Sequence, residues 1–141
     1  MVSQADCIFC KIAGGQVPCH KLYEDEQVVS FLDAGPLTRG HTLVVPKAHY
    51  MTLEAMPAEL AGSCMAAVAR VGRAVVAATG AGAWNVLQNN GRVAGQVVEH
   101  VHFHIIPRAE GDGLGYRWPA GTLDKTDAEQ LVGAITEALS G

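Results

Sequence analysis

A short stretch of the chain, EHVHFHIIPR at residues 99–108, places histidine at every second position. Side chains alternate between the two faces of an extended strand, so His100, His102 and His104 would share one face. The residues between them are apolar and would face the core: Val101, Phe103 and Ile105. One histidine on a strand face is consistent with ordinary solvation. Half of the six histidines of the chain on one face indicates a chemical role.

Metal binding and catalysis are the two roles that such a row of imidazoles can serve. Two histidines at positions i and i+2 can bind one zinc ion, with a third ligand from elsewhere in the chain. Strand residues rise ~3.3 Å each, which separates His100 from His104 by ~13 Å along the strand. Zinc–nitrogen bonds are only ~2.0–2.1 Å long, so these two cannot readily share one ion. We therefore expect a division of roles, with at most one end of the row bound to a metal.

The loop before the histidines, NNGRVAGQ at residues 89–96, has the composition of an anion-binding turn. Asn89 and Asn90 favour turns, and Gly91 and Gly95 let the backbone approach a ligand closely. Successive amides in such a loop can form a nest for an anion. Taken alone, the loop is better explained as an ordinary hairpin connection. Beside a row of neutral imidazoles, it predicts the arrangement needed for nucleophilic attack at phosphorus.

Strand-like segments must position these residues. Five are bounded by turn residues, at 20–25, 28–33, 41–46, 84–88 and 97–107. A long helix is expected from Pro57 to about Thr79, because proline favours the first helical position and Gly80 provides a stop. Its core-facing residues recur at three- and four-residue spacing: Leu60, Cys64, Val68, Val71 and Val75. Strands joined by short turns, with one long helix inserted, favour an antiparallel sheet with helices against it, which is an α+β fold.

Shorter helices are expected near both ends of the chain. The segment CIFCKIAGG, residues 7–15, predicts a helical turn that ends at its two glycines. Near the C-terminus, Thr126 and Glu129 match a capping box that would begin a final helix. Three residues of that helix are expected to face inward: Leu131, Ile135 and Leu139.

Length and composition limit the class of protein. The 141 residues suit one domain, residues 1–141, with 49% hydrophobic residues and a net charge of −4. No basic patch indicates nucleic acid. By the sequence pattern we expect no apolar run of the ~18–20 residues that cross a bilayer, and MVSQADCIFC lacks the pattern of a signal peptide. We therefore expect a cytoplasmic protein without a membrane partner.

The four cysteines are informative in a reducing compartment, where a disulfide framework is not expected. Cys7 and Cys10 form a C-x-x-C motif, which suggests metal or redox chemistry. Nothing indicates the βαβ unit of a thioredoxin-like redox protein. Cys19 and Cys64 lie near a strand start and in the long helix, and no role is expected for either.

Taken together, these motifs resemble the histidine triad (HIT) family. HVHFHII fits the pattern His-φ-His-φ-His-φ-φ with φ apolar, and NNGRVAGQ, FLD at 31–33 and GHTLVVPKAH at 40–49 are also similar. CIFCKI resembles bacterial members of the nucleotide-binding branch. The resemblance covers residues 7–108 and implies an antiparallel five-stranded sheet with one long helix and a C-terminal helix. It implies a nucleotide hydrolase or phosphoramidase that cleaves at the α-phosphate of nucleoside 5′-phosphate derivatives, adenosine among them.

The resemblance also implies roles for individual residues in a two-step reaction through a covalent nucleotidyl-histidine. His102 would be the nucleophile, kept neutral, with one ring nitrogen free and the proton of the other held by a backbone carbonyl. His104 would contact the phosphate near the leaving group and, when protonated, assist its departure. His41 matches a fourth histidine that orients the site. Asn89 matches a polar residue that contacts the scissile region.

Substrate-binding positions follow from the same resemblance. Gln96 and Val97 match residues whose backbone amides bind the phosphate, and Asp33 matches a ribose-binding carboxylate. Many relatives carry Ser or Thr in place of Val97. Losing that hydroxyl would cost ~0.5–1.5 kcal/mol, or up to about tenfold in phosphoramidase rate. An apolar base pocket, which could equally be simple core, would comprise Ile8, Phe9, Ile12, Phe31 and Leu32.

A metal site and a dimer are further implications of the resemblance. Cys7, Cys10, His49 and His100 would bind a structural zinc ion, and the chemistry itself would need no cofactor. Relatives form homodimers through the long helix and an edge strand, so we expect a homodimer. In eukaryotic-type relatives a tryptophan-proline element reaches the neighbouring subunit's site, and Trp118 would do so here.

Other functions remain open at this level. A dinucleoside polyphosphate hydrolase would use the same residues with a larger leaving group. A nucleotide-binding or scaffold protein with weak activity is disfavoured by the intact triad. A zinc hydrolase would need an open metal site at His102 and His104. Transferases of the galactose-phosphate type tend to carry glutamine where this chain has His104, which favours water as acceptor.

Overall fold

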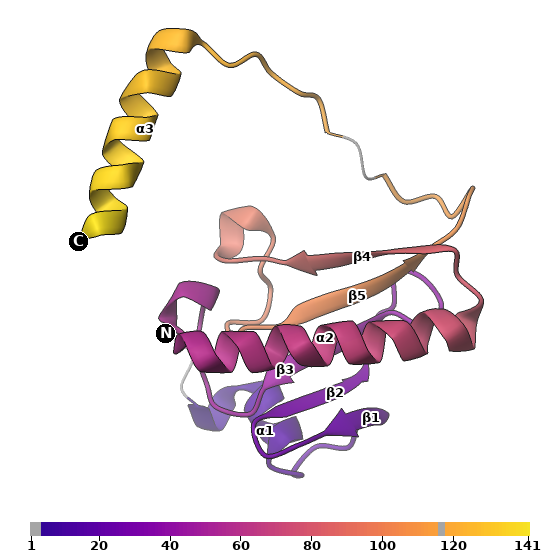
Figure 1. The fold of residues 1–141 in the computed structure, drawn as a ribbon. Coiled ribbons are helices and arrows are strands. Elements are labelled where there is room, and N and C mark those ends of the chain that lie inside the picture. The colour runs from indigo at the N-terminus through magenta and orange to yellow at the C-terminus, as the bar shows by residue number, and fades with distance from the viewer. Residues whose placement is uncertain (1–3, 116–117) are drawn as a thin grey trace.

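Five strands form one antiparallel sheet in the computed structural model, which describes residues 4–115 and 118–141 (Figure 1). The strands are β1 (Lys21–Glu24), β2 (Val28–Leu32), β3 (Thr42–Pro46), β4 (Ala83–Gln88) and β5 (Phe103–Arg108). Their order is β1-β2-β3-β5-β4, and every neighbouring pair is antiparallel. The α+β fold expected from the sequence is confirmed.

Two helices cover the two faces of this sheet, α1 (Ile8–Ala13) and α2 (Ala58–Thr79). A third helix, α3 (Lys125–Ser140), lies apart from it (Figure 1), and there are short 3-10 turns η1 (Gln4–Asp6), η2 (Leu53–Ala55) and η3 (Arg92–Ala94). The core under α2 contains the apolar residues that alternate with the three histidines: Val101, Phe103 and Ile105. A second core on the other face joins α1 to β2 and β3. The histidines therefore share the side of the sheet that carries α1.

Helix α2 begins and ends where the sequence predicts. Pro57 is its N-cap, and Gly80 is its C-cap with φ of 71°, a conformation that glycine adopts without strain. By length and composition α2 could cross a membrane, and it is the one helix of this kind among residues 4–115 and 118–141. The sequence had led us to expect no such segment. A buried core helix passes the same test, and one side of α2 forms the main core.

Three expectations about element boundaries and facing are wrong. Strand β5 begins only at Phe103, so His100 and His102 precede it, because the chain turns through the bend at residues 98–100. Helix α3 is capped by Asp124, whose carboxylate accepts from the amide of Asp127 at 3.0 Å, so Thr126 lies inside the helix.

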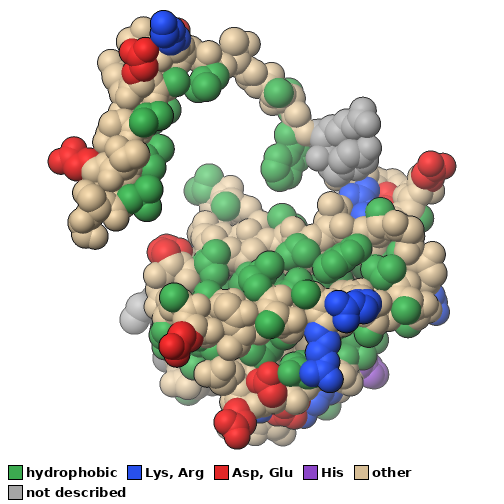
Figure 2. Space-filling model, viewed as in Figure 1, with side chains coloured by type: hydrophobic (Ala, Val, Ile, Leu, Met, Phe, Trp, Pro, Cys, Tyr) green, Lys and Arg blue, Asp and Glu red, His purple; other side chains and the backbone are tan. Residues whose placement is uncertain are grey.

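The third concerns the face of α3 that the sequence predicts to be inward. Its large apolar residues are exposed: Leu131 46%, Ile135 55% and Leu139 78%. The spacing that predicts an amphipathic helix is present, but the body of the chain does not cover it. Figure 1 shows α3 at the end of an extended segment, away from the sheet. In Figure 2 its hydrophobic side chains gather on the side that faces the rest of the molecule.

Candidate active site

His102 lies immediately before β5, and 6% of it is exposed. Its Nδ1 atom lies 2.7 Å from the carbonyl oxygen of His100, so Nδ1–H donates to that oxygen. This hydrogen bond fixes the tautomer and leaves a lone pair on Nε2. Burial lowers the pKa of His102, which keeps the ring neutral near pH 7. A neutral imidazole with a free Nε2 can act as a nucleophile.

A chain of hydrogen bonds runs from the backbone of residue 37 to His104. The amide of Leu37 donates to Nδ1 of His41 at 3.0 Å, so the proton of neutral His41 resides on Nε2. That Nε2 lies 2.9 Å from Nδ1 of His104, which therefore accepts. The proton of neutral His104 is consequently on its own Nε2. The tautomers of both rings are thus set by one backbone N–H.

Burial lowers the pKa of His104 to about 4, with smaller contributions from His102 and His41. Because that value lies well below 7, His104 is neutral in the free protein at neutral pH. The sequence-based expectation that His104 acts when protonated therefore does not describe its resting state. In the neutral ring, Nε2–H remains a hydrogen-bond donor.

Asp33 follows β2 and contacts His41. Its Oδ2 atom lies 3.4 Å from Nε2 of His41, and its Oδ1 accepts from the amide of Gly35 at 2.8 Å. The side chain of Asp33 is 21% exposed, so part of the carboxylate still faces solvent. Burial lowers the pKa of His41 although Asp33 opposes that shift. The resemblance implies a ribose contact for Asp33, and nothing in the sequence indicated its contact with His41.

Hydrogen bonds within the glycine loop before β5 fold it on itself. The side-chain Oε1 of Gln96 accepts from the amide of Gly91 at 2.7 Å, and its Nε2 donates to the carbonyl of Met51 at 2.7 Å. The backbone amide of Gln96 donates to the carbonyl of Gly91 at 3.1 Å. This amide, which the resemblance assigns to phosphate, is therefore engaged within the loop. Val97 beside it is 90% exposed.

Glycine is required at two positions of this loop. Gly91 and Gly95 have φ of 93° and 102°, which side chains rarely tolerate. The amide nitrogen Nδ2 of Asn89 lies 3.5 Å from the carbonyl of Gly95, which ties the start of the loop to its end.

The five residues predicted to line a base pocket divide into two groups. Phe9, Phe31 and Ile12 belong to the core cluster on the α1 side of the sheet. The Phe9 ring lies edge-on to His102 with centroids 5.1 Å apart. Ile8 and Leu32 are 41% and 38% exposed, so they offer apolar surface near this cluster.

Trp118 does not reach this site within its own chain. It is 84% exposed and lies in the extended segment before α3.

A second cluster, which shares His100 with the triad, contains the four predicted metal ligands. Cys7, Cys10, His49 and His100 bring one ligand atom each to within 4.8 Å of one another. Nδ1 of His100 lies 3.3 Å from Sγ of Cys7 and 3.2 Å from Nδ1 of His49. Sγ of Cys10 lies 3.4 Å from the same His49 atom. Tetrahedral zinc, with bonds of ~2.0–2.3 Å, separates its ligand atoms by roughly 3.3–3.8 Å, so the donor set fits zinc.

Hydrogen bonding prepares His100 for such a role. Its Nε2–H donates to the carbonyl of Pro46 at 2.8 Å, which directs the Nδ1 lone pair at the cysteines. Burial, followed by the adjacent Cys7, raises the pKa of the Cys10 thiol to about 11. A cation would reverse that shift, because metal ligands must be deprotonated.

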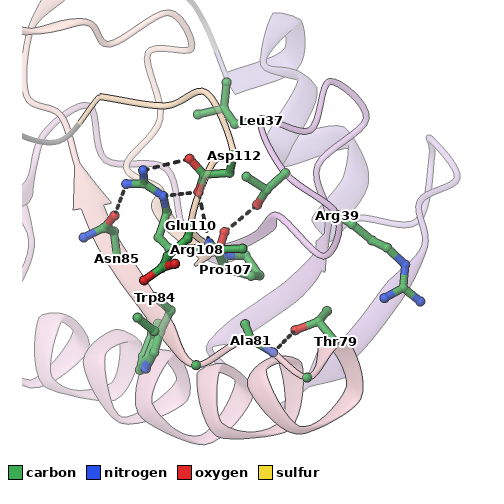
Figure 3. A pocket seen from close by; sticks show the side chains of 15 residues that line it. Leu37, Arg39, Thr79, Ala81, Trp84, Asn85, Pro107, Arg108, Glu110 and Asp112 are labelled. Atoms are coloured by element: carbon green, nitrogen blue, oxygen red, sulfur yellow. Dashed lines mark hydrogen bonds and ion pairs between the residues drawn. The ribbon is translucent and has the colours of Figure 1, made fainter.

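A cavity of about 960 Å³ opens at the far end of β5, and the residues that line it include none of the three triad histidines (Figure 3). Two residues that line it, Thr38 and Pro107, form a hydrogen bond that fixes the segment carrying Leu37. The Thr38 hydroxyl donates to the carbonyl of Pro107 at 2.8 Å. Arg108 binds Asp112 at 2.8 Å and Asn85 at 2.7 Å. Of these bonds, the one from Thr38 ties the segment that carries Leu37 to β5, and the amide of His41 donates to the carbonyl of Thr38 at 3.1 Å.

The family of the chain is shown by comparison with known proteins. A model of the HIT domain matches residues 14–111. The chain is 46% identical over 140 residues to adenylylsulfatase HINT3 of Arabidopsis thaliana, spanning 96% of this chain and 71% of that protein. It is 42% identical over 146 residues to adenosine 5′-monophosphoramidase HNT1 of Candida albicans, spanning 99% and 95%. The chain therefore belongs to the HIT family, whose relatives include proteins named as hydrolases.

Solved structures confirm the fold. SMU.412c from Streptococcus mutans UA159 superposes with a TM-score of 0.92 at 39% identity, covering 97% of this chain and 87% of that one. A zinc-bound histidine triad family protein from Mycobacterium smegmatis superposes with a TM-score of 0.75 at 36% identity, covering 98% of each chain. The family and fold class expected from the sequence are therefore confirmed. Zinc is compatible with the Cys/His cluster of this chain.

Proposed function

We propose that this protein is a nucleotide hydrolase or phosphoramidase that cleaves at the α-phosphate of nucleoside 5′-phosphate derivatives, with adenosine as a nucleoside that it accepts. The observation that carries the proposal is the tautomer of His102, whose Nδ1–H is held by the carbonyl of His100 at 2.7 Å. A free Nε2 together with an anion-binding loop is what attack at phosphorus requires, and the glycine-bearing loop precedes His102 in the chain. The names of the Arabidopsis and Candida relatives support adenosine derivatives.

In the first step, Nε2 of His102 forms a bond to the α-phosphorus. The bond from phosphorus to the leaving oxygen or nitrogen breaks, and its electron pair goes to the leaving group, which takes a proton from solvent water when it departs as an amine. In the second step, water attacks the same phosphorus and gives its proton to solvent, the phosphorus–nitrogen bond breaks with its electron pair returning to Nε2 of His102, and the nucleoside monophosphate is released. His104 donates a hydrogen bond from its neutral Nε2–H to the phosphate in both steps, which stabilises the charge that develops there.

We propose that phosphate binding depends more on Val97 than on Gln96. The Gln96 amide already donates to Gly91, and its buried side chain holds the loop together. The amide of Val97 and the side chain of Asn89 then bind the phosphate. Asp33 accepts hydrogen bonds from the ribose hydroxyls, while its contact with His41 helps to hold that ring.

The base would lie against the apolar cluster of Phe9, Ile12 and Phe31, beside the exposed faces of Ile8 and Leu32. An apolar pocket with few polar contacts discriminates weakly between purines. We therefore expect little preference between adenosine and guanosine derivatives.

We propose that Cys7, Cys10, His49 and His100 hold a structural zinc ion. The separations of their ligand atoms and the orientation of His100 support this assignment. Four protein ligands leave no open position for water, so the ion would supply stability and no chemistry. It would tie the N-terminal segment to the residue whose carbonyl orients His102.

We also propose a homodimer in which β4 and α2 contact their counterparts. The order of the sheet leaves β4 at an edge, and Met65 of α2 and Val86 of β4 are 47% and 43% exposed. Three expectations stay predictions: that residues 1–141 form one domain, that the protein is cytoplasmic, and that it has no nucleic-acid or membrane partner.

Two other activities can be weighed against this geometry. A dinucleoside polyphosphate hydrolase would use the same residues, and only the leaving group would differ. A zinc hydrolase through His102 and His104 is disfavoured, because Nδ1 of His104 accepts from His41, which leaves the proton of neutral His104 on Nε2 and no free lone pair for a metal. A scaffold with weak activity has no separate observation in its favour.

Mass spectrometry of protein quenched during turnover of an adenosine phosphoramidate tests the proposal. An adenylyl adduct on His102 is expected, and His102→Ala should lose both adduct and turnover. An adduct on another residue, or turnover that survives in His102→Ala, would overturn the mechanism. A substrate panel of aminoacyl-adenylates, phosphoramidates and dinucleoside polyphosphates then decides among leaving groups.

A further inference from the structure

The two cysteines of the C-x-x-C motif bring their sulfur atoms to the same part of the Cys/His cluster. Cys7 is the N-cap of α1, and Cys10 lies in the first turn of that helix. Their Sγ atoms lie within 4.8 Å of each other, as do all four ligand atoms of the cluster. The Sγ atom of Cys7 is 3.3 Å from Nδ1 of His100, and that of Cys10 is 3.4 Å from Nδ1 of His49. The two sulfurs are therefore neighbours in the folded chain.

Charge makes this pair of sulfurs dependent on a cation. Cysteines that bind zinc are thiolates, so the zinc-bound cluster would hold two adjacent negative charges. Cys7 is only 2% exposed, and buried charges need a partner of opposite charge. A disulfide removes both charges at once. The pair can therefore be neutralised in two ways, by a bound cation or by a bond between the sulfurs.

The local geometry permits that bond. A disulfide is ~2.05 Å long, so the two Sγ atoms would have to approach from a separation of at most 4.8 Å. The backbone of Cys7 is extended, with φ of −80° and ψ of 121°, and lies outside the helix. Rotation at Cys7 can therefore bring the sulfurs together without breaking a hydrogen bond inside α1.

The two sulfurs also differ in their access to solvent. Cys10 is half-buried, whereas Cys7 is buried. Ile8, which lies between them, is 41% exposed, so this turn of α1 is at the surface. A soluble oxidant therefore reaches Cys10 before Cys7. An accessible thiolate beside a protected one is the arrangement in which oxidation ends in a disulfide.

We propose that Cys7 and Cys10 are a site of reversible oxidation by hydrogen peroxide, which joins them in a disulfide and releases the zinc ion. The Cys10 thiolate attacks one peroxide oxygen, the O–O bond breaks, and a sulfenic acid and hydroxide form. The Cys7 thiolate then attacks Sγ of Cys10, the S–O bond breaks, and a second hydroxide leaves. Solvent protonates both hydroxides to water, and the two electrons lost by the sulfurs reduce the peroxide. The inference rests on the zinc site proposed above and adds what controls its occupancy.

Release of the ion should loosen the attachment of the N-terminal segment. His49 and His100 alone offer half of the four ligands that a structural zinc ion needs. Through the ion, Cys7 is tied to a residue 93 positions away and Cys10 to one 39 positions away, whereas the disulfide joins near neighbours. Cross-links that close long loops constrain the unfolded chain more than those that close short loops. The oxidised protein should therefore melt about 5 °C or more below the zinc-bound protein.

Peroxide treatment of the zinc-loaded, full-length protein tests the proposal. A chromogenic chelator measures released zinc, and mass spectrometry reads the tryptic peptide that ends at Lys11 and contains both cysteines. One equivalent of zinc per chain should be released as that peptide loses two hydrogen atoms. Dithiothreitol with added zinc should reverse both changes, because a thiol–disulfide exchange reopens the bond.

Other results would overturn the proposal. These are zinc that stays bound while the peptide remains reduced, a disulfide that includes Cys19, or zinc release with Cys10 as a sulfonic acid and no disulfide. A protein that takes up no zinc overturns this inference together with the zinc site. The His102 adduct remains an independent test of the chemistry.

Single serine variants test the order of attack. Cys7→Ser keeps the accessible thiol without its partner, so a sulfenic acid should accumulate at Cys10 and react with dimedone. Cys10→Ser leaves only the buried thiol, and the same peptide should carry about tenfold less adduct. Cys19→Ser is the control and should release zinc at the wild-type rate, because Cys19 lies outside the four-ligand cluster. Equal labelling of the first two variants would contradict the roles assigned to the cysteines.

Discussion

The Nε2 atom of His41 lies 2.9 Å from the Nδ1 atom of His104. Because the Leu37 amide occupies the other nitrogen of His41, the direction of this hydrogen bond is determined. His41 donates, His104 accepts, and the remaining proton of His104 is available to a substrate. One backbone amide therefore sets which nitrogen of His104 can donate, while the carbonyl of His100 sets which nitrogen of His102 keeps its lone pair.

Removal of the Leu37 amide proton should impair turnover. Leu37→Pro has no backbone N–H to donate to His41, so His41 and His104 can each adopt either neutral tautomer. As a result, kcat should fall about 10–100-fold, with a smaller change in KM. Leu37→Ala keeps the amide and removes only an exposed side chain, so it should retain activity. Steady-state kinetics on an adenosine phosphoramidate measures both. Wild-type kcat in a folded Leu37→Pro protein would show that this hydrogen bond does not matter.

Stability should decrease as pH falls from about 6.5 towards 4. Burial lowers the pKa of His104 to about 4 and also lowers that of His41, so the unfolded chain binds protons more readily than the folded one. The unfolded state is therefore favoured as pH falls through the ordinary histidine pKa, by on the order of 1 kcal/mol per pH unit for each group. Thermal melts across this range measure the slope. His104→Asn should flatten it, and an unchanged slope in that variant would contradict the assignment.

Loss of one cluster cysteine should affect stability more than catalysis. Cys7→Ala removes a ligand that is 2% exposed, so bound zinc measured by elemental analysis should fall from one equivalent to near zero. The melting temperature should drop by about 5 °C or more, with turnover largely kept. Cys19→Ala is the control, because Cys19 lies outside the four-ligand cluster. A wild-type protein purified without zinc, or equal melting temperatures for the two variants, would remove the metal assignment.

A hydroxyl introduced at position 97 should favour phosphoramidates. Val97 is 90% exposed, so Val97→Ser needs no repacking and adds a donor beside the expected phosphate position. One such hydrogen bond raises the rate up to about tenfold. Val97→Ala shortens the side chain without adding a donor and should show no gain. If both variants accelerate hydrolysis equally, the effect is one of access rather than hydrogen bonding.

Two glycines of α2 should respond to alanine in opposite directions. A Cβ at Gly72 would overlap the Trp84 ring, so Gly72→Ala should destabilise the fold by about 1–3 kcal/mol. A Cβ at Gly62 meets nothing within 4 Å, so Gly62→Ala should stabilise it by about 0.5–1 kcal/mol. Denaturant unfolding measures both. A neutral Gly72→Ala would mean that β4 can move away from α2 at little cost.

The sequence by itself determined the parts of this protein that depend on local pattern. Period-two alternation around His102 and the proline and glycine at either end of α2 are local signals, and they predicted the buried side of the last strand and the limits of the long helix. The four candidate metal ligands were predicted from residue type and from resemblance, and the structure brings them together. The expected capping box at Thr126 failed because Asp124 offers an equally good cap two residues earlier.

Tertiary structure alone decided the direction of each hydrogen bond in the site. Two such contacts are those of Leu37 with His41 and of Gln96 with Gly91. Each depends on how the backbone folds in three dimensions. No residue pattern predicts which ring nitrogen or which backbone amide is left without a partner. The placement of α3 was decided the same way. Its amphipathic spacing predicts that one side packs against an apolar surface. The spacing does not predict which surface that is, because the hydrophobic effect is not directional.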